Sequence, residues 1–397
     1  MYLSKKRTGY FLWISFVTFL CLKLESVQFL TPFGKVYREI PIVLAAVLML
    51  FCILRFRKFS RISSYFLIYC IYLIIMTVAN RGSVHTALIQ ICPSVCMVLM
   101  CDINMRDKPI NFLGVIGAFL SVLVVFDFLS ILLFPNGLFK TSLYTDNWIL
   151  GYKTQRVNIA LPAIAALATS SIFRKGRVSL ITWMILVIGI MSAFFSGAIG
   201  GLVAMILFAL LLFLVYGIGN KINLQIIVHK FLNAKMIFAI LIVLNILIAV
   251  IQNIELFEFL IIGVLDKSET LTGRTIIWER CLEIIREHPF FGVGYLNSKE
   301  FVDLTGIPGG TQPHNMILGF LVYSGVVGLG LYAIPLFKSI SCIEPSNYRV
   351  SSAFVFCIII NMVIGITSLN NYTTFNFASI VILWYINTLQ RDDRIDL

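Results

Sequence analysis

Long runs of apolar residues alternate with short polar segments along most of the chain. A helix of about 20 apolar residues crosses the hydrocarbon core of a bilayer, so each run predicts one membrane-spanning helix. The pattern predicts twelve such helices, at residues 9–28, 39–54, 62–80, 84–101, 110–134, 157–173, 178–195, 198–217, 236–252, 315–337, 351–369 and 371–389.

The first apolar run is the weakest, because Lys23 and Glu25 interrupt it. It follows the charged lead Lys5-Lys6-Arg7 but has no small-residue cleavage site, so we expect a retained anchor. A further apolar stretch at 257–265 predicts an interfacial or re-entrant segment. The chain therefore divides into residues 1–252 with nine spans, a long outer loop at 253–314, and residues 315–397 with three spans and a tail.

Composition strengthens this interpretation. Hydrophobic residues make up 59% of the chain and charged residues only 13%, whereas soluble proteins are roughly 25% charged. This excludes a soluble enzyme or binding module. The predicted fold is an all-α polytopic membrane protein with about 12 transmembrane helices and one long extracytoplasmic loop that contains a short amphipathic helix.

The chain has 31 Lys and Arg against 19 Asp and Glu, a net charge of +12. Most basic residues fall in short loops on one side of the predicted bundle, which favours a multi-pass plasma-membrane protein with both termini cytoplasmic over a nucleic-acid-binding protein. Two long outer loops, near 135–156 and 253–314, are also basic. They form either a solvated surface beside anionic lipid or an electropositive pocket for an anionic ligand.

The second outer loop contains one predicted amphipathic helix, at residues 271–289. Its two faces are apolar and charged, with Ile277, Cys281, Ile284 and Ile285 on the first and Arg280, Glu283 and Glu287 on the second. Pro289 should end this helix, and residues 290–294 should form a flexible turn. A Gly- and Pro-rich passage then leads to His314-Asn315, immediately before the tenth span.

The same region carries an ordered set of short motifs. In order they are Gly273-Arg274-Thr275, Trp278, Pro289, Gly292-Val293-Gly294, His314-Asn315 and Gly325-Val-Val-Gly328. The set resembles the O-antigen ligase and polymerase superfamily of bacterial membrane proteins. Residues 150–156, with Leu161-Pro162, look like the L-G-x-K-N stretch of Gram-positive capsule and exopolysaccharide polymerases (Wzy type), although Thr154 stands where Asn is usual.

The resemblance implies glycosyl transfer from a lipid-linked donor with an undecaprenyl diphosphate leaving group. The leaving group gains charge, and the planar fork of an arginine suits it, so Arg274 is the candidate catalytic cation. His314 is the candidate base, with Asn315 beside it to orient a sugar or the imidazole. Alternatively, His314 caps the tenth helix and Arg274 contacts lipid phosphate.

One position departs from the family pattern. Members often carry S-G-S-R-G-G at the outer end of a middle span, and this chain reads Ser196-Gly-Ala-Ile-Gly-Gly201, with Ile199 where arginine is expected. If that arginine normally holds phosphate, another cation must replace it, and the candidates are Lys153 and Arg156 in the first basic outer loop.

Three further residues are candidates for substrate binding. Asp127 is a carboxylate inside the fifth span, where such groups are costly and usually functional. It could pair with a loop arginine, orient the acceptor sugar, or form a polar helix–helix contact. Gly292 and Gly294 would allow the backbone to approach a ligand closely, but turn formation explains them equally well.

The sequence shows no D-x-D motif and no His/Cys cluster at ligand spacing on the outer side, so we expect a metal-independent transferase without cofactors. The expected partners are an undecaprenyl-diphosphate-linked oligosaccharide, membrane lipids, and flippase and chain-length regulator proteins. The resemblance favours a polysaccharide polymerase that transfers a glycan onto a lipid-linked repeat unit. The alternatives are an O-antigen-ligase-type transfer to another acceptor, and a transporter or flippase of lipid-linked oligosaccharide.

Overall fold

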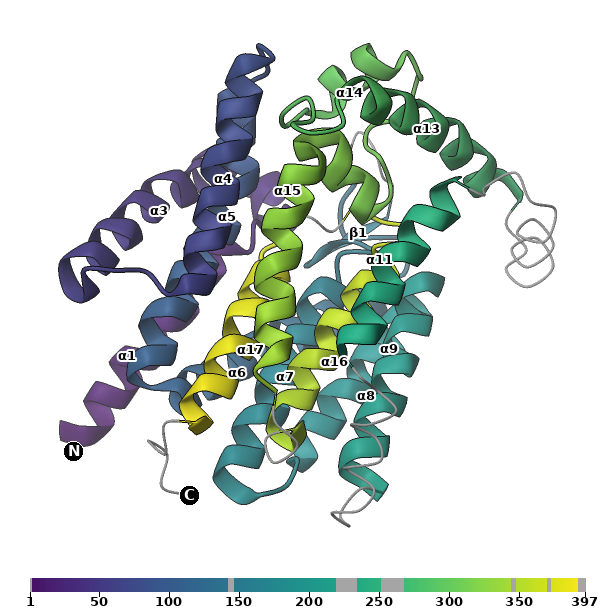
Figure 1. Ribbon diagram of the computed structural model, residues 1–397. Coiled ribbons are helices and arrows are strands. Elements are labelled where there is room, and N and C mark those ends of the chain that lie inside the picture. Colours follow the sequence, from purple (N-terminus) through teal and green to yellow (C-terminus); the bar gives the residue numbers. More distant parts are fainter. Residues whose placement is uncertain are drawn as a thin grey trace.

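The computed structural model describes residues 2–141, 146–218, 234–250, 268–343, 348–369 and 373–391. They form a bundle of helices with one small two-stranded hairpin (Figure 1). The elements are α1 (Tyr2–Cys21), α2 (Glu25–Leu30), α3 (Gly34–Phe56), α4 (Arg61–Ala79), α5 (Val84–Asp107), α6 (Pro109–Leu133), β1 (Asn147–Trp148), β2 (Gly151–Tyr152), α7 (Val157–Lys175), α8 (Leu180–Phe195), α9 (Ile199–Phe213) with a π-helical end (Leu214–Ile218), α11 (Ala234–Val250), α13 (Ser268–Glu287), α14 (Ser298–Thr305), α15 (Met316–Ser341), α16 (Tyr348–Ile364) and α17 (Asn376–Arg391).

The all-α polytopic membrane fold is confirmed. Within the described residues, seven helices are long and apolar enough to cross a bilayer, and four shorter apolar helices accompany them. Each of the twelve predicted spans overlaps one of the longer helices, the first also reaches into α2, and α13 and α14 lie outside all of them. The predicted apolar segment at 257–265 falls outside the described residues.

The predicted first span, 9–28, is wrong in its second half. Helix α1 ends at Cys21, and α2 begins only at Glu25. Between them, Lys23 adopts a left-handed backbone conformation with φ of 52°, and its carbonyl accepts a hydrogen bond from the Gln28 side chain at 2.7 Å. The two charged residues that interrupt the apolar pattern therefore mark a break between two helices.

Burial separates inner from outer helices. In α5 and α7, 72% of the most apolar 18-residue window is buried, against 22% in α3. Helix α3 accordingly lies at the margin of the bundle, beside α5 (Figure 1). Its exposed Val43, Val47 and Leu54 fit a surface that faces lipid, where no water has to be excluded.

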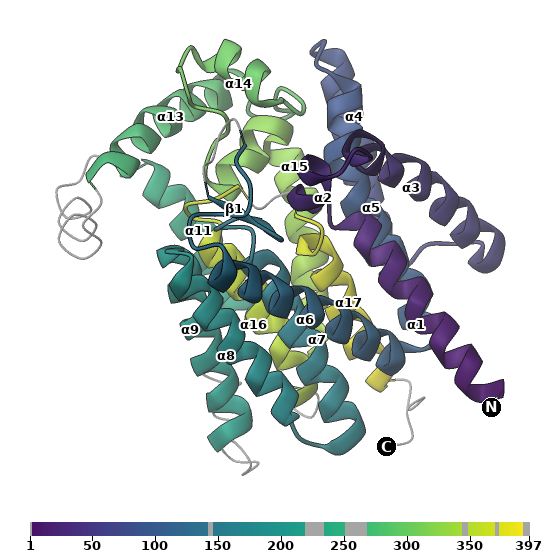
Figure 2. The same cartoon turned by 180° about the vertical axis from the view of Figure 1, so that it is seen from behind.

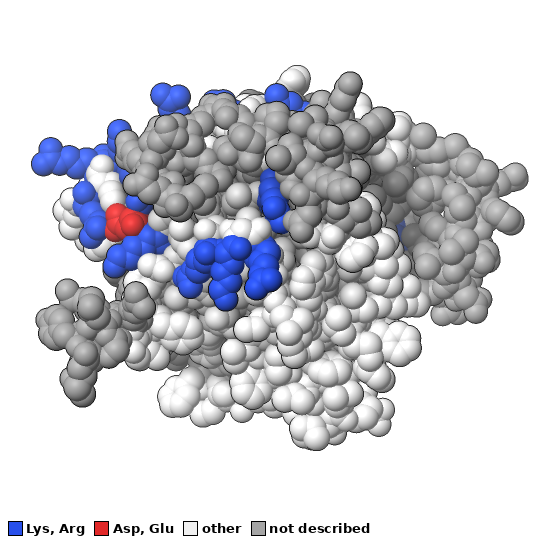
Figure 3. All heavy atoms as spheres, turned by 90° about the horizontal axis from the view of Figure 1, so that it is seen from below, with Lys and Arg blue, Asp and Glu red and all other residues white. Residues whose placement is uncertain are grey.

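The two ends of the bundle differ. Helices α13 and α14 lie at one end, whereas α1 begins and α17 ends at the other (Figures 1 and 2). Seen from that second end, the surface shows several groups of Lys and Arg and little acidic surface outside the undescribed atoms (Figure 3). This distribution agrees with the charge pattern of the sequence, and the cytoplasmic placement of both termini stays a prediction.

The amphipathic helix predicted in the long loop is confirmed as α13. Ile277, Cys281 and Ile284 are buried, and Arg280 forms an exposed ion pair with Glu283. The helix ends at Glu287, two residues before Pro289.

The prediction of a flexible turn at residues 290–294 is wrong, because backbone hydrogen bonds hold this segment in place. Helix α15 is broken at Gly325 (φ 59°, ψ −166°), and the backbone N–H groups of Val293 and Gly294 donate to carbonyls of this region, Val322 and Tyr323, at 2.9 Å each. A Cβ added at Gly292 would lie 2.5 Å from the Ser324 nitrogen. The glycine therefore permits the segment to pair with the break in α15.

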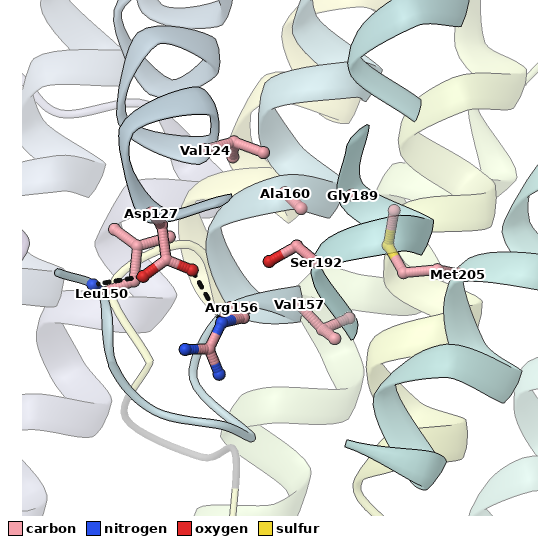
Figure 4. A pocket seen from close by; sticks show the side chains of 9 residues that line it. All are labelled: Val124, Asp127, Leu150, Arg156, Val157, Ala160, Gly189, Ser192 and Met205. Atoms are coloured by element: carbon pink, nitrogen blue, oxygen red, sulfur yellow. Dashed lines mark hydrogen bonds and ion pairs between the residues drawn. The ribbon is translucent and has the colours of Figure 1, made fainter. Parts of the chain in front are cut away.

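A buried ion pair fixes the hairpin to the bundle. The Asp127 side chain, 1% exposed in α6, accepts hydrogen bonds from Arg156 Nε at 2.7 Å and from the Leu150 backbone at 2.9 Å (Figure 4). The guanidinium of Arg156 also lies 4.6 Å from the centre of the Trp148 ring, a cation–π contact. One carboxylate in a span thus holds both the β1–β2 turn and the start of α7.

We predict that Asp127→Asn lowers the free energy of unfolding by about 3–5 kcal/mol, because it leaves the charge of Arg156 buried and uncompensated. Adding Arg156→Met should restore part of the loss, since it removes that charge while keeping a side chain of similar length. Thermal unfolding of the purified protein in detergent measures both effects. The exposed Asp303→Asn in α14 is the control, and equal stability of Asp127→Asn and wild type would contradict the structural role.

Candidate active site

A cavity of about 620 Å³ opens where several helix ends meet. Its wall comes from the α1–α2 break, α3, α5, the β2–α7 connection, the start of α13, the residues before α15 and the α16–α17 connection. Both predicted catalytic residues, Arg274 and His314, line it. The structure therefore brings together two side chains that are 40 positions apart in the sequence.

His314 is held in a left-handed conformation, with φ of 51°. Contacts on both sides fix it. The carbonyl of Pro313 accepts a hydrogen bond from the Trp278 indole at 2.9 Å, and the Met316 N–H donates to the Gly365 carbonyl at 2.7 Å. A non-glycine residue in this region costs of order 1–3 kcal/mol, and such strain persists only where neighbours enforce it. The imidazole is thus positioned by its surroundings before any ligand arrives.

Asn315, the predicted partner of His314, is fully buried and does not line the cavity. Its Oδ1 caps α15 by accepting from the Leu318 N–H at 2.9 Å, and its Nδ2 donates to the Ile366 carbonyl at 3.1 Å. These hydrogen bonds fix Asn315 in place directly after His314. The predicted contact of Asn315 with a sugar stays a prediction.

Helix α13 explains the spacing of Arg274 and Trp278. They are four positions apart, so both side chains lie on one face, one turn apart. Trp278 is 1% exposed and binds the carbonyl just before His314, which brings Arg274 to the cavity beside His314. The tryptophan thereby places the arginine and the histidine relative to each other.

Arg274 and burial together set the protonation state of His314. Burial first, and then the positive charge of Arg274, lower the pKa of His314 to about 4. The imidazole is consequently neutral at pH 7 and carries a free lone pair. Arg274 also acts on Tyr152, where its charge opposes part of the rise in pKa that burial causes. Its field thus covers both the hairpin side and the histidine side of the cavity.

Neutral hydrogen-bonding groups make up much of the remaining wall. They are amide and hydroxyl side chains, namely Gln28, Gln90, Thr154, Gln155, Asn158, Gln312, Thr367, Ser368, Thr373 and Thr374. Each offers donors, acceptors or both. The Oδ1 atom of Asn158 is buried and has no hydrogen-bond partner among the residues that the structure describes, so it can accept from a ligand hydroxyl. Such a wall suits a ligand with many hydroxyl groups.

The remaining predicted binding residues lie elsewhere. Arg156 and Asp127 pair with each other beside the hairpin, around a space of about 10 Å³. Lys153 lies with its ammonium 5.6 Å from the centre of the Tyr152 ring and does not line the cavity. Gly292 and Gly294 pack against the backbones of α15 and α4. Their roles in substrate binding stay predictions without support from these contacts.

Sequence reasoning missed three charged residues of the cavity, Lys23, Glu25 and Arg38. The first two were visible as charges that interrupt an apolar run, which is the usual sign of a functional polar group at a membrane. Arg38 gave no signal, because it looks like an ordinary charge near the start of a span. Ile199, where the family expects arginine, is 40% exposed and does not line the cavity.

No metal-binding group of three or more His, Cys, Asp or Glu occurs in the described parts of the chain. Metal independence remains an expectation from the motifs.

Comparison with known proteins identifies the region that contains the two candidate catalytic residues. Residues 184–333 match the family model of the O-antigen ligase, and this segment includes Arg274 and His314. No characterised protein in the curated set matches the chain. Residues 184–333 are thus similar to the O-antigen ligase family, and the match supports glycan transfer by a membrane protein in general.

Proposed function

We propose that the protein is an extracytoplasmic polysaccharide polymerase of a bacterial plasma membrane. It transfers a glycan from an undecaprenyl diphosphate carrier onto a lipid-linked repeat unit, without a metal ion. The observation that carries this proposal is the cavity in which Arg274 and His314 meet among amide and hydroxyl side chains. The neutral side chains can form hydrogen bonds with a glycan, Arg274 can bind the diphosphate of the donor, and His314 can take the proton of the acceptor hydroxyl.

The proposed reaction is a single displacement. Nε2 or Nδ1 of neutral His314 takes the proton of the acceptor hydroxyl, and the oxygen attacks the anomeric carbon of the donor glycan. The bond from that carbon to the diphosphate oxygen breaks, and the electron pair leaves with the diphosphate. Arg274 stabilises the charge that develops there, since its planar fork can bind two phosphate oxygens. The products are the lengthened lipid-linked glycan and undecaprenyl diphosphate.

The low pKa of His314 fits this sequence of events. The free enzyme keeps the imidazole neutral, because burial and then the positive charge of Arg274 lower the histidine pKa. A bound diphosphate adds negative charge next to both groups and raises the histidine pKa. The base therefore becomes stronger when the donor is in place.

Two alternatives compete with the polymerase. A ligase would use the same cavity and differ only in its acceptor. The polymerase is favoured because Leu150, Tyr152 and Thr154, from the stretch that looks like that of capsule polymerases, line the cavity. A flippase would be expected to bind its cargo near the bilayer midplane, whereas this cavity is formed by residues at helix ends.

The direct test is chain growth in detergent. Purified protein is incubated with lipid-linked repeat units alone, and the products are separated by size. A ladder of longer glycans supports a polymerase, because detergent removes the two compartments that transport requires. Absence of longer products with a wild-type protein that is folded and binds the substrate would overturn the proposal, and transfer only to an added non-repeat acceptor would assign a ligase.

In this assay His314→Ala should reduce the rate by about 10²–10⁴, the usual contribution of a general base. Arg274→Lys should reduce it by about 10²–10³, because a point charge cannot replace a fork that binds the developing charge. The matched controls are His85→Ala, at an exposed histidine, and Arg280→Lys, on the same helix as Arg274. Full activity of His314→Ala would remove the base assignment.

The pH dependence tests the coupling between Arg274 and His314. The acid limb of kcat/KM reports the free enzyme and should lie near pH 4, because His314 loses its base form only as it becomes protonated there. The acid limb of kcat reports the substrate complex and should lie at higher pH, since the bound diphosphate raises the pKa. Initial rates between pH 3.5 and 8 at low and saturating substrate separate the two limbs, and a kcat limb at lower pH than that of kcat/KM would contradict the mechanism.

A further inference from the structure

The α1–α2 break directs a lysine to the cavity. Lys23 has a left-handed backbone and lines the cavity. Among the described residues of the cavity wall, His314 is the other non-glycine residue with this conformation. The hydroxyl of Tyr37 secures the break from both sides. It donates to the Phe19 carbonyl at 2.6 Å and accepts from the Leu24 N–H at 3.3 Å. Strain enforced by neighbours at a cavity wall is typical of a functional residue.

The ammonium group of Lys23 has a neutral partner. It donates to the amide oxygen of Gln90 in α5 at 3.0 Å. Burial first, and then the charge of Arg38, lower the pKa of Lys23 to about 8, so the side chain is still mostly protonated at pH 7. Because Gln90 is uncharged, this contact leaves the positive charge of the partly buried Lys23 without a neutralising negative charge.

A second cation lies close to Lys23. Arg38, from the second turn of α3, lines the same cavity, and its charge is close enough to affect Lys23. Its ion pair with Glu39 is exposed and long, at 3.7 Å, and such pairs neutralise little. The carboxyl group of Glu25 also lines the cavity, but burial raises its pKa and disfavours its charged form.

The N-terminal helices thus bring two like charges together at a cavity, and their mutual repulsion is relieved when an anion binds between them. Neither residue lies in the segment 184–333 that matches the O-antigen ligase family.

We propose that Lys23 and Arg38 form a second anion site of this cavity, which binds one phosphate of the lipid-linked diphosphate while Arg274 binds the other. This inference rests on the proposed function. It gives the N-terminal helices a part in substrate binding, and it supplies the cation that is missing at Ile199. The Gln90 amide acts as a positioning residue, because it holds the Lys23 ammonium at the wall.

Binding of undecaprenyl diphosphate and undecaprenyl monophosphate to the full-length protein, measured by native mass spectrometry from detergent, tests the proposal. Lys23→Gln should weaken diphosphate binding about tenfold, the effect of one lost charged hydrogen bond, and should affect the monophosphate little. Lys23→Arg should retain most of the affinity, since it keeps the charge. Lys35→Gln is the matched control, because Lys35 is exposed near the start of α3 and lies outside the cavity.

Further variants and a third ligand in the same binding assay distinguish failure of the second anion site from failure of the proposed function. If Arg274→Gln weakens diphosphate binding while Lys23→Gln and Arg38→Gln do not, the second site is wrong and the proposed function stands. If only the N-terminal variants weaken it, the second site stands and Arg274 loses its assigned role. Phosphatidylglycerol is the third ligand, and weakening of its binding by Lys23→Gln without an effect on the diphosphate would overturn the proposal. Thermal unfolding verifies that each variant is folded.

Discussion

The hydrogen bond from the Trp278 indole to the Pro313 carbonyl connects the amphipathic helix α13 to the start of α15. Arg274 lies one turn before Trp278, and His314 directly follows Pro313, so this one contact sets the position of both side chains at the cavity. Two further contacts depend on the same junction. Asn315 caps α15, and the N–H of Met316 is bound by the Gly365 carbonyl. Without them, the left-handed backbone of His314 would relax to a conformation of lower energy.

The positive charges of Arg274, Lys23 and Arg38 lie along the cavity next to this junction. Burial and then the charge of Arg274 lower the pKa of His314, and the negative charge of a bound diphosphate would oppose the effect of Arg274. Lys23 and Arg38 bring further positive charge to the wall from helices that lie far away in the sequence. The ion pair of Asp127 and Arg156 has a different function in the fold, because each charge compensates the other and holds the hairpin that forms part of the wall.

Much of the fold could be predicted from the sequence because hydrophobic runs report membrane burial directly. The spans and the amphipathic face of α13 belong to this class. Local motifs pointed to Arg274 and His314, which line one cavity in the structure, and their catalytic roles stay predictions. The break at Lys23 could not be predicted in the same way, since it depends on Tyr37 and Gln28, which bind the broken ends. For Asp127, pairing with a loop arginine was one of three alternatives, and the sequence could not choose among them because Asp127 and Arg156 come close only after α6 and α7 have packed together. The fixed path of residues 290–294 depends on the break in α15 at Gly325, a tertiary pairing that no local pattern encodes.

The most direct measurement is a cryo-electron microscopy structure of the protein with undecaprenyl diphosphate bound. The account predicts density for the diphosphate inside the cavity, with a phosphate oxygen within hydrogen-bonding distance of Arg274 and the His314 imidazole facing the lipid-distal phosphate, where the glycan would be attached. A diphosphate bound at Arg156, with Asp127 displaced, or bound outside this cavity would contradict the central claim that Arg274 and His314 form one active site.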